Sequence, residues 1–175
     1  TLKKNTVVAT VMSNLGFFLM AKEKGLKAEQ TKVGDRYVLE KMREIGANLG
    51  GEQSGHIIFL DENTTGDGLL SALHLLQVVV ETGKPLSELA AVMTVLPQAL
   101  INAAVPNHKK ESYMDYPEIA ESIEQLTKKF AGEGRVLIRP SGTEPLVRVM
   151  IEGKDQEMIE KDAKQLATLI QDVML

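Results

Sequence analysis

Two short loops hold the residues whose types and spacing could do chemistry, and the richer one runs from Arg139 to Pro145. Arg139 brings a guanidinium, and Ser141 and Thr143 bring hydroxyls. Gly142 leaves the backbone N–H groups between them accessible. Donors that converge from a tight turn suit a phosphate, whose oxygens accept several hydrogen bonds at once. The same composition is also good turn chemistry, so the local residues leave both an anion-binding loop and a plain hairpin turn open.

The other loop, which comes first along the chain, follows a glycine-rich stretch and carries Glu52, Ser54 and His56 at alternating positions. If the backbone is extended there, the three side chains share one face at the mouth of a strand. A carboxylate beside a hydroxyl can hold sugar hydroxyls, because a hydrogen bond to a charged group contributes about 1.5–3 kcal/mol. The three glycines between positions 50 and 55 predict a sharp turn that a ligand can approach closely. The alternative is that Glu52 is an ordinary loop carboxylate and that His56 caps or packs against the strand.

Other polar residues have both a functional and a structural interpretation. Arg36, at a predicted helix start, could contact an anion or pair locally, and the sequence does not separate the two. His74 lies beside the leucine face of its helix, which favours partly buried packing. Three acidic residues lack the spacing of a calcium loop, and we interpret them as capping and solvation: Asp61, Glu62 and Asp67. We therefore expect no metal site in this chain.

The composition narrows the function further. The chain has 175 residues, a net charge of −4 and no cysteine, which excludes disulfides, thiolate catalysis and cysteine-bound metals. The pairs Lys109-Lys110 and Lys128-Lys129 are interpreted as solvated faces rather than basic clusters, so no nucleic-acid partner is expected. No apolar run reaches membrane-spanning length and no leader is evident, so we expect no membrane partner and a cytoplasmic location.

Hydrophobic periodicity predicts the elements that must position the first loop. An apolar, β-branched run at residues 6–12 predicts a strand, a second short strand is predicted near residues 27–33, and a helix follows each, ending at Gly25 and Gly46. After the Glu52 loop come a strand at 57–60, a long helix capped by Thr65 or Asp67, and a further helix at 85–93. The βαβα order predicts a mixed, largely parallel three-layer α/β domain with right-handed crossovers.

From Ala99 onward the predicted order changes to β-α-β-β-α. Strands at 136–138 and 146–151 flank the Arg139 loop, and the last helix repeats apolar residues at helical spacing. This order predicts a small α+β domain with helices on one face of a mainly antiparallel sheet. We place the boundary near Pro97, which gives domains at residues 1–97 and 98–175.

Four segments together resemble the α-D-phosphohexomutases over the whole length of the chain: Val33–Val38, Gly51–His56, Thr64–Gly68 and Arg139–Pro145. That family has four domains, and this chain looks like only the third and fourth. Within the family, Gln53 favours the bacterial members that act on an amino-sugar phosphate over those that act on mannose or glucose phosphates.

The resemblance implies roles for both loops. Glu52 and Ser54 would match the residues that grip sugar hydroxyls, and His56 belongs to the same loop. The clamp on the substrate phosphate that is not reacting would be formed by four residues, Arg139, Ser141, Gly142 and Thr143. Such a clamp recognises the charge and shape of a phosphate and does not distinguish which sugar carbon bears it.

In the family, a phosphoserine of the first domain exchanges its phosphoryl group with the sugar, and Mg²⁺ held by the second domain offsets the charge. Neither the Ser-His-Asn nucleophile loop nor the Asp-Gly-Asp metal loop occurs in the 175 residues, so no catalytic residue is expected here. The resemblance implies one half, inactive alone, of an isomerase that interconverts glucosamine 6-phosphate and glucosamine 1-phosphate through glucosamine 1,6-bisphosphate. Its expected partners are this substrate and the N-terminal domains of the same protein, and a homodimer is left open for the whole enzyme.

Two other functions stay open at this point. The chain could belong to a mutase for glucose or mannose phosphates, since a single residue at position 53 separates these weakly. It could also be a non-catalytic sugar-phosphate-binding module that retains the two loops.

Overall fold

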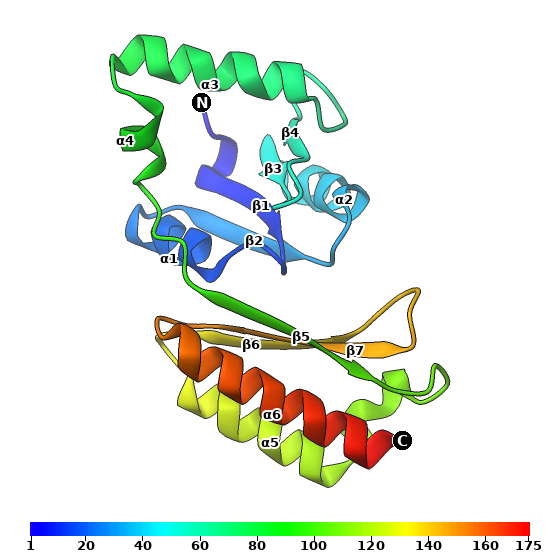
Figure 1. Cartoon of the computed structure of the whole chain (residues 1–175). Helices are drawn as coiled ribbons and strands as arrows, with labels where there is room; N and C mark the ends of the chain where they lie inside the picture. Colours follow the sequence, from blue (N-terminus) through cyan, green and yellow to red (C-terminus); the bar gives the residue numbers. More distant parts are fainter. The chain divides into compact units, whose positions relative to one another are not determined.

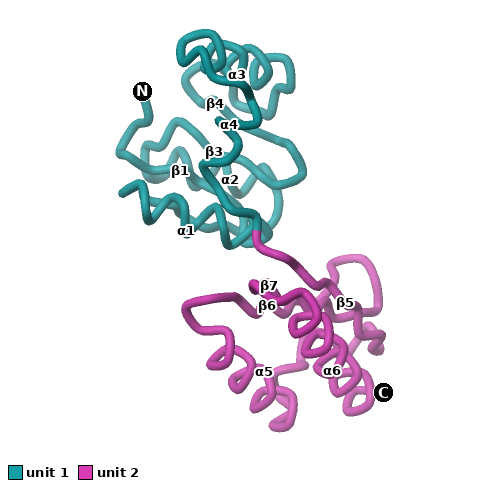
Figure 2. Tube along the Cα trace, turned by 60° about the vertical axis from the view of Figure 1, so that its left-hand side comes forward, with its two compact units in different colours: residues 1–95 teal, residues 96–175 magenta.

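The computed structural model describes all 175 residues, which divide into two compact units, Thr1–Val95 and Leu96–Leu175 (Figure 2). The first unit contains a 3₁₀ turn, four strands and four α-helices: η1 (Lys3–Asn5), β1 (Thr6–Thr10), α1 (Leu15–Glu23), β2 (Lys27–Thr31), α2 (Asp35–Ile45), β3 (Leu49–Gly51), β4 (Ile57–Phe59), α3 (Gly68–Thr82) and α4 (Leu86–Ala90). The second contains β5 (Gln98–Ala104), η2 (Lys110–Asp115), α5 (Pro117–Lys129), β6 (Arg135–Pro140), β7 (Leu146–Glu152) and α6 (Gln156–Met174).

The sheet of the first unit has the strand order β2-β1-β3-β4 (Figure 1). Strand β1 runs parallel to both β2 and β3, and β4 runs antiparallel to β3. The connection from β1 through α1 to β2 and the connection from β2 through α2 to β3 cross the sheet in opposite directions. Because both connections are expected to be right-handed, the two helices lie on opposite faces of the sheet. The predicted mixed, largely parallel α/β architecture is confirmed.

The helix ends of this unit follow the signals read from the sequence. The Asn14 side chain accepts a hydrogen bond from Gly16 N at 2.9 Å and caps α1. Of the two candidates for capping α3, Asp67 does so, because its Oδ1 accepts from the first free N–H groups of the helix at 3.0 Å. Gly46 ends α2 with a φ of 72°, a left-handed conformation that a residue with a side chain adopts only with strain.

The glycine-rich stretch before Glu52 is not the turn that we expected. Leu49–Gly51 forms strand β3, paired on both sides. A Cβ atom at Gly50 would lie 2.6 Å from the Met42 sulfur and 2.7 Å from Val38 Cγ1, so Gly50 is there to let α2 pack directly on the strand. The glycine therefore serves helix–sheet packing, and ligand approach is not needed to explain it.

Helix α3 is apolar yet has no buried residue. Leu69 is 73% exposed and Val80 is 80% exposed, and the helix lies apart from the strands in Figure 1. It meets the sheet at β4, where the His74 ring stacks on Phe59 with 4.1 Å between centroids. His74 is thus partly buried packing, as predicted, and its Nε2 lies 2.9 Å from Glu62 Oε1.

The second unit is an antiparallel sheet of order β5-β7-β6, with α5 and α6 on one face (Figure 1). The buried face of α6 repeats at helical spacing through Ile159, Ala163, Leu166 and Ile170, and Val147, Val149 and Ile151 of β7 belong to the same core. This confirms the predicted α+β architecture. No helix of the chain combines the length and the apolar content needed to cross a membrane.

Candidate functional site

The Glu52 loop is the tight connection of the β3–β4 hairpin. Glu52 N donates to His56 O at 3.0 Å, and Gly55 N donates to Glu52 O at 3.1 Å. Gly55 has a φ of 98°. The expectation that an extended backbone puts the alternating side chains on one face is therefore wrong, because two antiparallel strands joined by so few residues force the chain to reverse.

Glu52 nevertheless meets His56, through the turn rather than through alternation. The Glu52 side chain is only 9% exposed, and its Oε1 accepts from Gly34 N at 2.8 Å. Its Oε2 lies 3.7 Å from His56 Nδ1, and Asp35 Oδ2 lies 3.9 Å from the same nitrogen. Two carboxylates thus flank one imidazole, an acidic environment suited to accepting hydrogen bonds from hydroxyl or amino groups.

The other polar residues of this unit take different positions. Ser54 lies exposed in the turn. Arg36 is a strongly exposed side chain whose Nε donates to Glu40 Oε1 at 2.8 Å, a local i,i+4 pair. Of the two interpretations of Arg36, its geometry favours local pairing.

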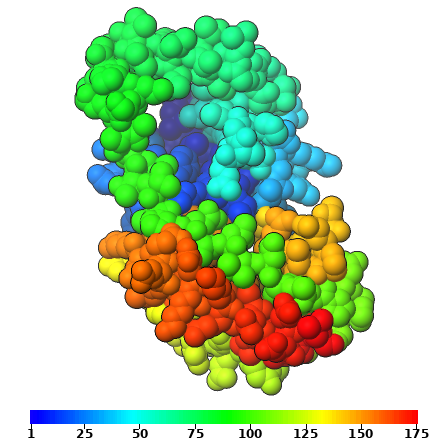
Figure 3. Space-filling model, viewed as in Figure 1, coloured from blue at the N-terminus to red at the C-terminus, as the bar shows by residue number.

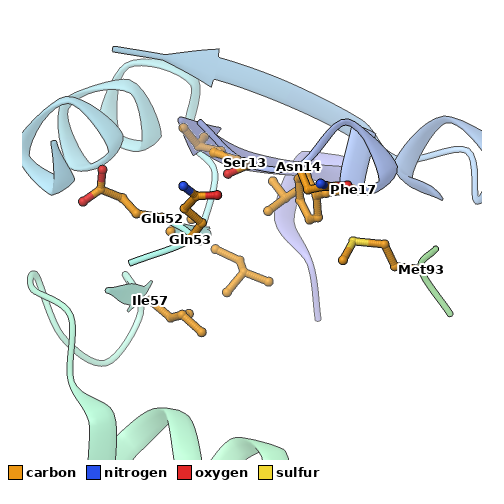
Figure 4. Close-up of a pocket in the computed structure, with 13 residues that line it drawn as sticks. Ser13, Asn14, Phe17, Glu52, Gln53, Ile57 and Met93 are labelled. Carbon is orange, nitrogen blue, oxygen red and sulfur yellow. The ribbon is translucent and has the colours of Figure 1, made fainter. Parts of the chain in front are cut away.

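A cavity of about 350 Å³ lies beside the Glu52 loop, on the face of the sheet opposite α2. Its walls are apolar and include Val7, Phe17 and Leu49. Glu52 and Gln53 lie on one side of it and Met93 on the other (Figure 4). Figure 3 shows a hollow bordered by the green α3–α4 segment, in which dark blue atoms of the N-terminal residues are visible. The sugar loop predicted from the sequence therefore borders an apolar hollow.

The Arg139 loop is the connection of the β6–β7 hairpin, and internal hydrogen bonds define its shape. Ser141 N donates to Leu146 O at 2.9 Å, and Glu144 N donates to Ser141 Oγ at 3.2 Å. Ser141 is only 2% exposed, whereas Gly142 and Thr143 are exposed at the tip. The exposed donors of the loop are therefore at its tip, above a serine whose oxygen already accepts one hydrogen bond.

The loop concentrates positive charge. Arg139 pairs with Arg148 in the β6–β7 register, so the two guanidinium-bearing residues are direct cross-strand neighbours. Burial, and then the charge of Arg148, lower the pKa of Arg139. One carboxylate offsets part of this charge, because Arg148 Nη2 donates to Glu144 Oε2 at 2.7 Å. The Nε atom of Arg148 is buried without a hydrogen-bond partner. An anion at this loop would relieve the repulsion.

Two cationic residues of this region were missed by the sequence reasoning. Arg148 was interpreted only as part of a strand. Its place opposite Arg139 depends on the pairing register of β6 and β7, which cannot be derived from the sequence. The interpretation of Lys110 as solvated is wrong: it is 7% exposed, and its Nζ donates to Glu144 O at 3.3 Å. Lys109 is also engaged, through Nζ and the carbonyl of Met174 at 3.0 Å.

Nowhere in the chain do three or more histidine, aspartate or glutamate side chains gather so that they could hold a metal ion.

Comparison with known proteins assigns the chain to a family. Residues 1–96 match the family model for the phosphoglucomutase/phosphomannomutase alpha/beta/alpha domain III, and residues 100–169 match that for the C-terminal domain of the same family. The chain belongs to the phosphoglucomutase/phosphomannomutase family. The resemblance inferred from the motifs is confirmed.

The curated relatives are named more specifically than the family as a whole. The phosphoglucosamine mutase of Ruminiclostridium cellulolyticum is 64% identical over 170 residues, which cover 97% of this chain and 38% of that protein. The phosphoglucosamine mutase of Clostridioides difficile is 57% identical over 171 residues, which cover 98% of this chain and 38% of that protein. The chain thus spans 38% of the length of both relatives.

Solved structures show the same fold. One is N-acetylphosphoglucosamine mutase of Aspergillus fumigatus in complex with GlcNAc-6P and magnesium, with a TM-score of 0.78, 21% identity, and coverage of 97% of this chain and 39% of that one. Another is a phosphoglucomutase/phosphomannomutase family protein of Burkholderia thailandensis, with a TM-score of 0.69, 22% identity, and coverage of 95% and 38%. At this identity the likeness concerns the fold alone.

Proposed function

We propose that this chain is the C-terminal half of a phosphoglucosamine mutase, which as a whole protein interconverts glucosamine 6-phosphate and glucosamine 1-phosphate. The relatives of that name at 57–64% identity support the assignment. The observation that carries it is the cross-strand arginine pair at the Arg139 loop, where Arg148 has the Glu144 carboxylate as a partner and Arg139 lies beside it in the strand register. A substrate phosphate supplies the missing negative charge.

The proposed division of labour places phosphate recognition in the second unit. Arg139 would donate to the phosphate from its guanidinium, and Gly142 and Thr143 from the exposed tip of the loop. Ser141 would act mainly by shaping the loop, since its buried Oγ accepts from Glu144 N and donates to Glu144 Oε2 at 3.5 Å. A phosphate oxygen would replace that long donor contact. We assign this phosphate-binding role to the domain at residues 98–175.

Sugar recognition would belong to the domain at residues 1–97. Glu52 presents an acidic edge beside His56, which fits hydroxyl or amino donors of a hexosamine. Ser54 is exposed in the same turn and can contact the sugar directly. The chemistry that this chain supplies is therefore binding and orientation, and these make up most of what a phosphoryl-transfer enzyme provides.

The reacting groups would come from the missing N-terminal domains. Mg²⁺, present in a solved complex of the Aspergillus fumigatus enzyme, would offset phosphate charge when bound there. A bisphosphorylated sugar, like the glucose 1,6-bisphosphate in another complex of that enzyme, must turn end for end between the two transfers. The Arg139 loop would suit this, because it recognises phosphate charge without contacting the sugar carbon that bears it.

The test uses the purified 175-residue chain. A coupled mutase assay is expected to show no turnover from glucosamine 6-phosphate, and mixing with the N-terminal segment of the parent protein is expected to produce it. Turnover by the chain alone at the level of a whole mutase would contradict the proposal. A mixed sample active only on glucose or mannose phosphates would move the chain to another member of the family.

A further inference from the structure

Lys110 is a buried charge at the edge of the Arg139 loop. It is the first residue of η2 and is 7% exposed. Lysine is almost never fully buried unless it is paired, because removing an ammonium from water is costly. Lys110 Nζ donates to a neutral backbone carbonyl, that of Glu144, at 3.3 Å. The burial of this charge therefore needs an explanation.

The residue that Lys110 contacts, Glu144, makes several of the loop's hydrogen bonds. The carbonyl of Glu144 also accepts from Leu146 N at 2.9 Å. Its N–H donates to Ser141 Oγ at 3.2 Å, and its carboxylate holds Arg148 Nη2 at 2.7 Å. A shift of this one residue would move the serine and the second arginine together.

The geometry points to Lys110 as a positioning residue that holds the Arg139 loop in its phosphate-binding shape. This inference rests on the proposed function. Lys110 fixes the Glu144 peptide, and Glu144 in turn sets the places of Ser141 and Arg148. The ammonium also adds a third positive charge to Arg139 and Arg148, against one carboxylate, so its burial is compensated when a phosphate dianion is bound.

The element that carries Lys110 offers a matched control. Tyr113, also in η2, donates from its hydroxyl to Ile138 O at 3.3 Å. Both side chains therefore link η2 to a carbonyl of the β6–β7 hairpin, one in the strand and one in the loop. Tyr113→Phe removes the strand contact and leaves the loop contact in place.

The experiment titrates the ¹⁵N-labelled chain with inorganic phosphate and follows the backbone amides of residues 141–144 and 146. Lys110→Met keeps the apolar stem of the side chain but removes the charge and the donors. It is expected to displace these amide signals before any phosphate is added and to weaken phosphate binding about tenfold, as for the loss of one charge-assisted hydrogen bond. Tyr113→Phe is expected to change the affinity by less than about twofold.

Lys110→Arg separates position from charge, because it keeps the charge with a different reach. The inference predicts that the phosphate affinity of Lys110→Arg recovers only to the extent that its loop amide signals return to their positions in the unaltered chain. Full recovery with the loop signals still displaced would overturn it, as would unchanged binding by Lys110→Met or equal weakening by Tyr113→Phe. If the unaltered chain and Arg139→Ala bind phosphate equally, the proposed function fails, while the phosphate-free loop signals still decide whether Lys110 holds the loop.

Discussion

The two candidate loops are both hairpin connections between antiparallel strands, yet their chemistry is opposite. Carboxylates flank His56 at the β3–β4 loop, whereas the β6–β7 loop has three cationic residues near it, Arg139, Arg148 and Lys110, of which Arg148 pairs with a carboxylate. One is suited to accepting hydrogen bonds and the other to donating them. The comparison shows that a hairpin only positions the residues of its loop. What the loop can bind is decided by the side chains that are not needed to hold the hairpin itself together.

The frameworks under the two loops also differ. The first hairpin is anchored by packing, with α2 pressed onto Gly50. The second is anchored by a buried ion pair, in which Arg135 Nη2 lies 2.6 Å from Glu152 Oε2 and Glu152 is fully buried. Substitutions can therefore separate framework from binding in each unit.

The largest effect is expected at the ionic framework of the second unit. Arg135→Met removes the guanidinium that neutralises the buried Glu152 carboxylate, which should lower the free energy of unfolding by about 3–5 kcal/mol in a urea titration. The double variant Arg135→Met with Glu152→Met should recover most of this loss, because the buried charge is gone. A single variant as stable as the unaltered chain would remove the ion pair from the comparison.

The next effect concerns the charge of the second loop. Arg139→Ala should weaken binding of inorganic phosphate about 100-fold, since it removes a guanidinium that can form two charge-assisted hydrogen bonds. Calorimetric titration measures this directly. The control is Arg36→Ala in the first unit, whose guanidinium already pairs with Glu40. Weakened phosphate binding by the control would show that the first unit, too, recognises the anion.

The packed framework of the first unit should respond more moderately. Gly50→Ala forces a methyl group against Met42 and Val38, and overpacking of this kind costs about 1–3 kcal/mol of stability. Gly68→Ala is the matched control, because a Cβ there meets nothing within 4 Å. Thermal unfolding of both variants tests this, and equal melting temperatures would mean that α2 adjusts without cost.

The smallest effect is expected at the first loop itself. Glu52→Ala leaves Gly34 N without its acceptor and should cost about 0.5–1.5 kcal/mol of stability. Glu52→Gln keeps an acceptor oxygen, so its stability should lie within about 0.5 kcal/mol of the unaltered chain. Chemical denaturation separates the two variants. If both lose the same stability, then the charge of Glu52, rather than its acceptor, supports the turn.

Local signals predicted the fold well. The helix ends are set by short-range hydrogen bonds at Asn14 and Asp67 and by a left-handed φ at Gly46. Such interactions involve residues close together in the sequence, so the sequence alone can predict them. Strand β3 was missed because a run of Leu-Gly-Gly has low strand propensity, and only its pairing with β1 and β4 makes it a strand.

The candidate site was predicted in part for the same reason. The residues of both loops are adjacent in sequence, so their donors and acceptors could be counted. Arg148 and Lys110 join the second loop only through strand register and the placement of η2, which are long-range properties. The alternation of Glu52 and His56 was misread because it assumed an extended backbone where antiparallel pairing imposes a turn.

Helix α3 has a consequence for the behaviour of the chain in a test tube. The leucines and valines of α3 and the leucines of α4 form a water-facing apolar surface, and neither helix has a buried residue. Surfaces of this kind bind hydrophobic dyes and favour concentration-dependent association. We expect the working concentration for the titrations above to be limited by this one helix, and a detergent or a polar substitution on α3 to raise it without altering either loop.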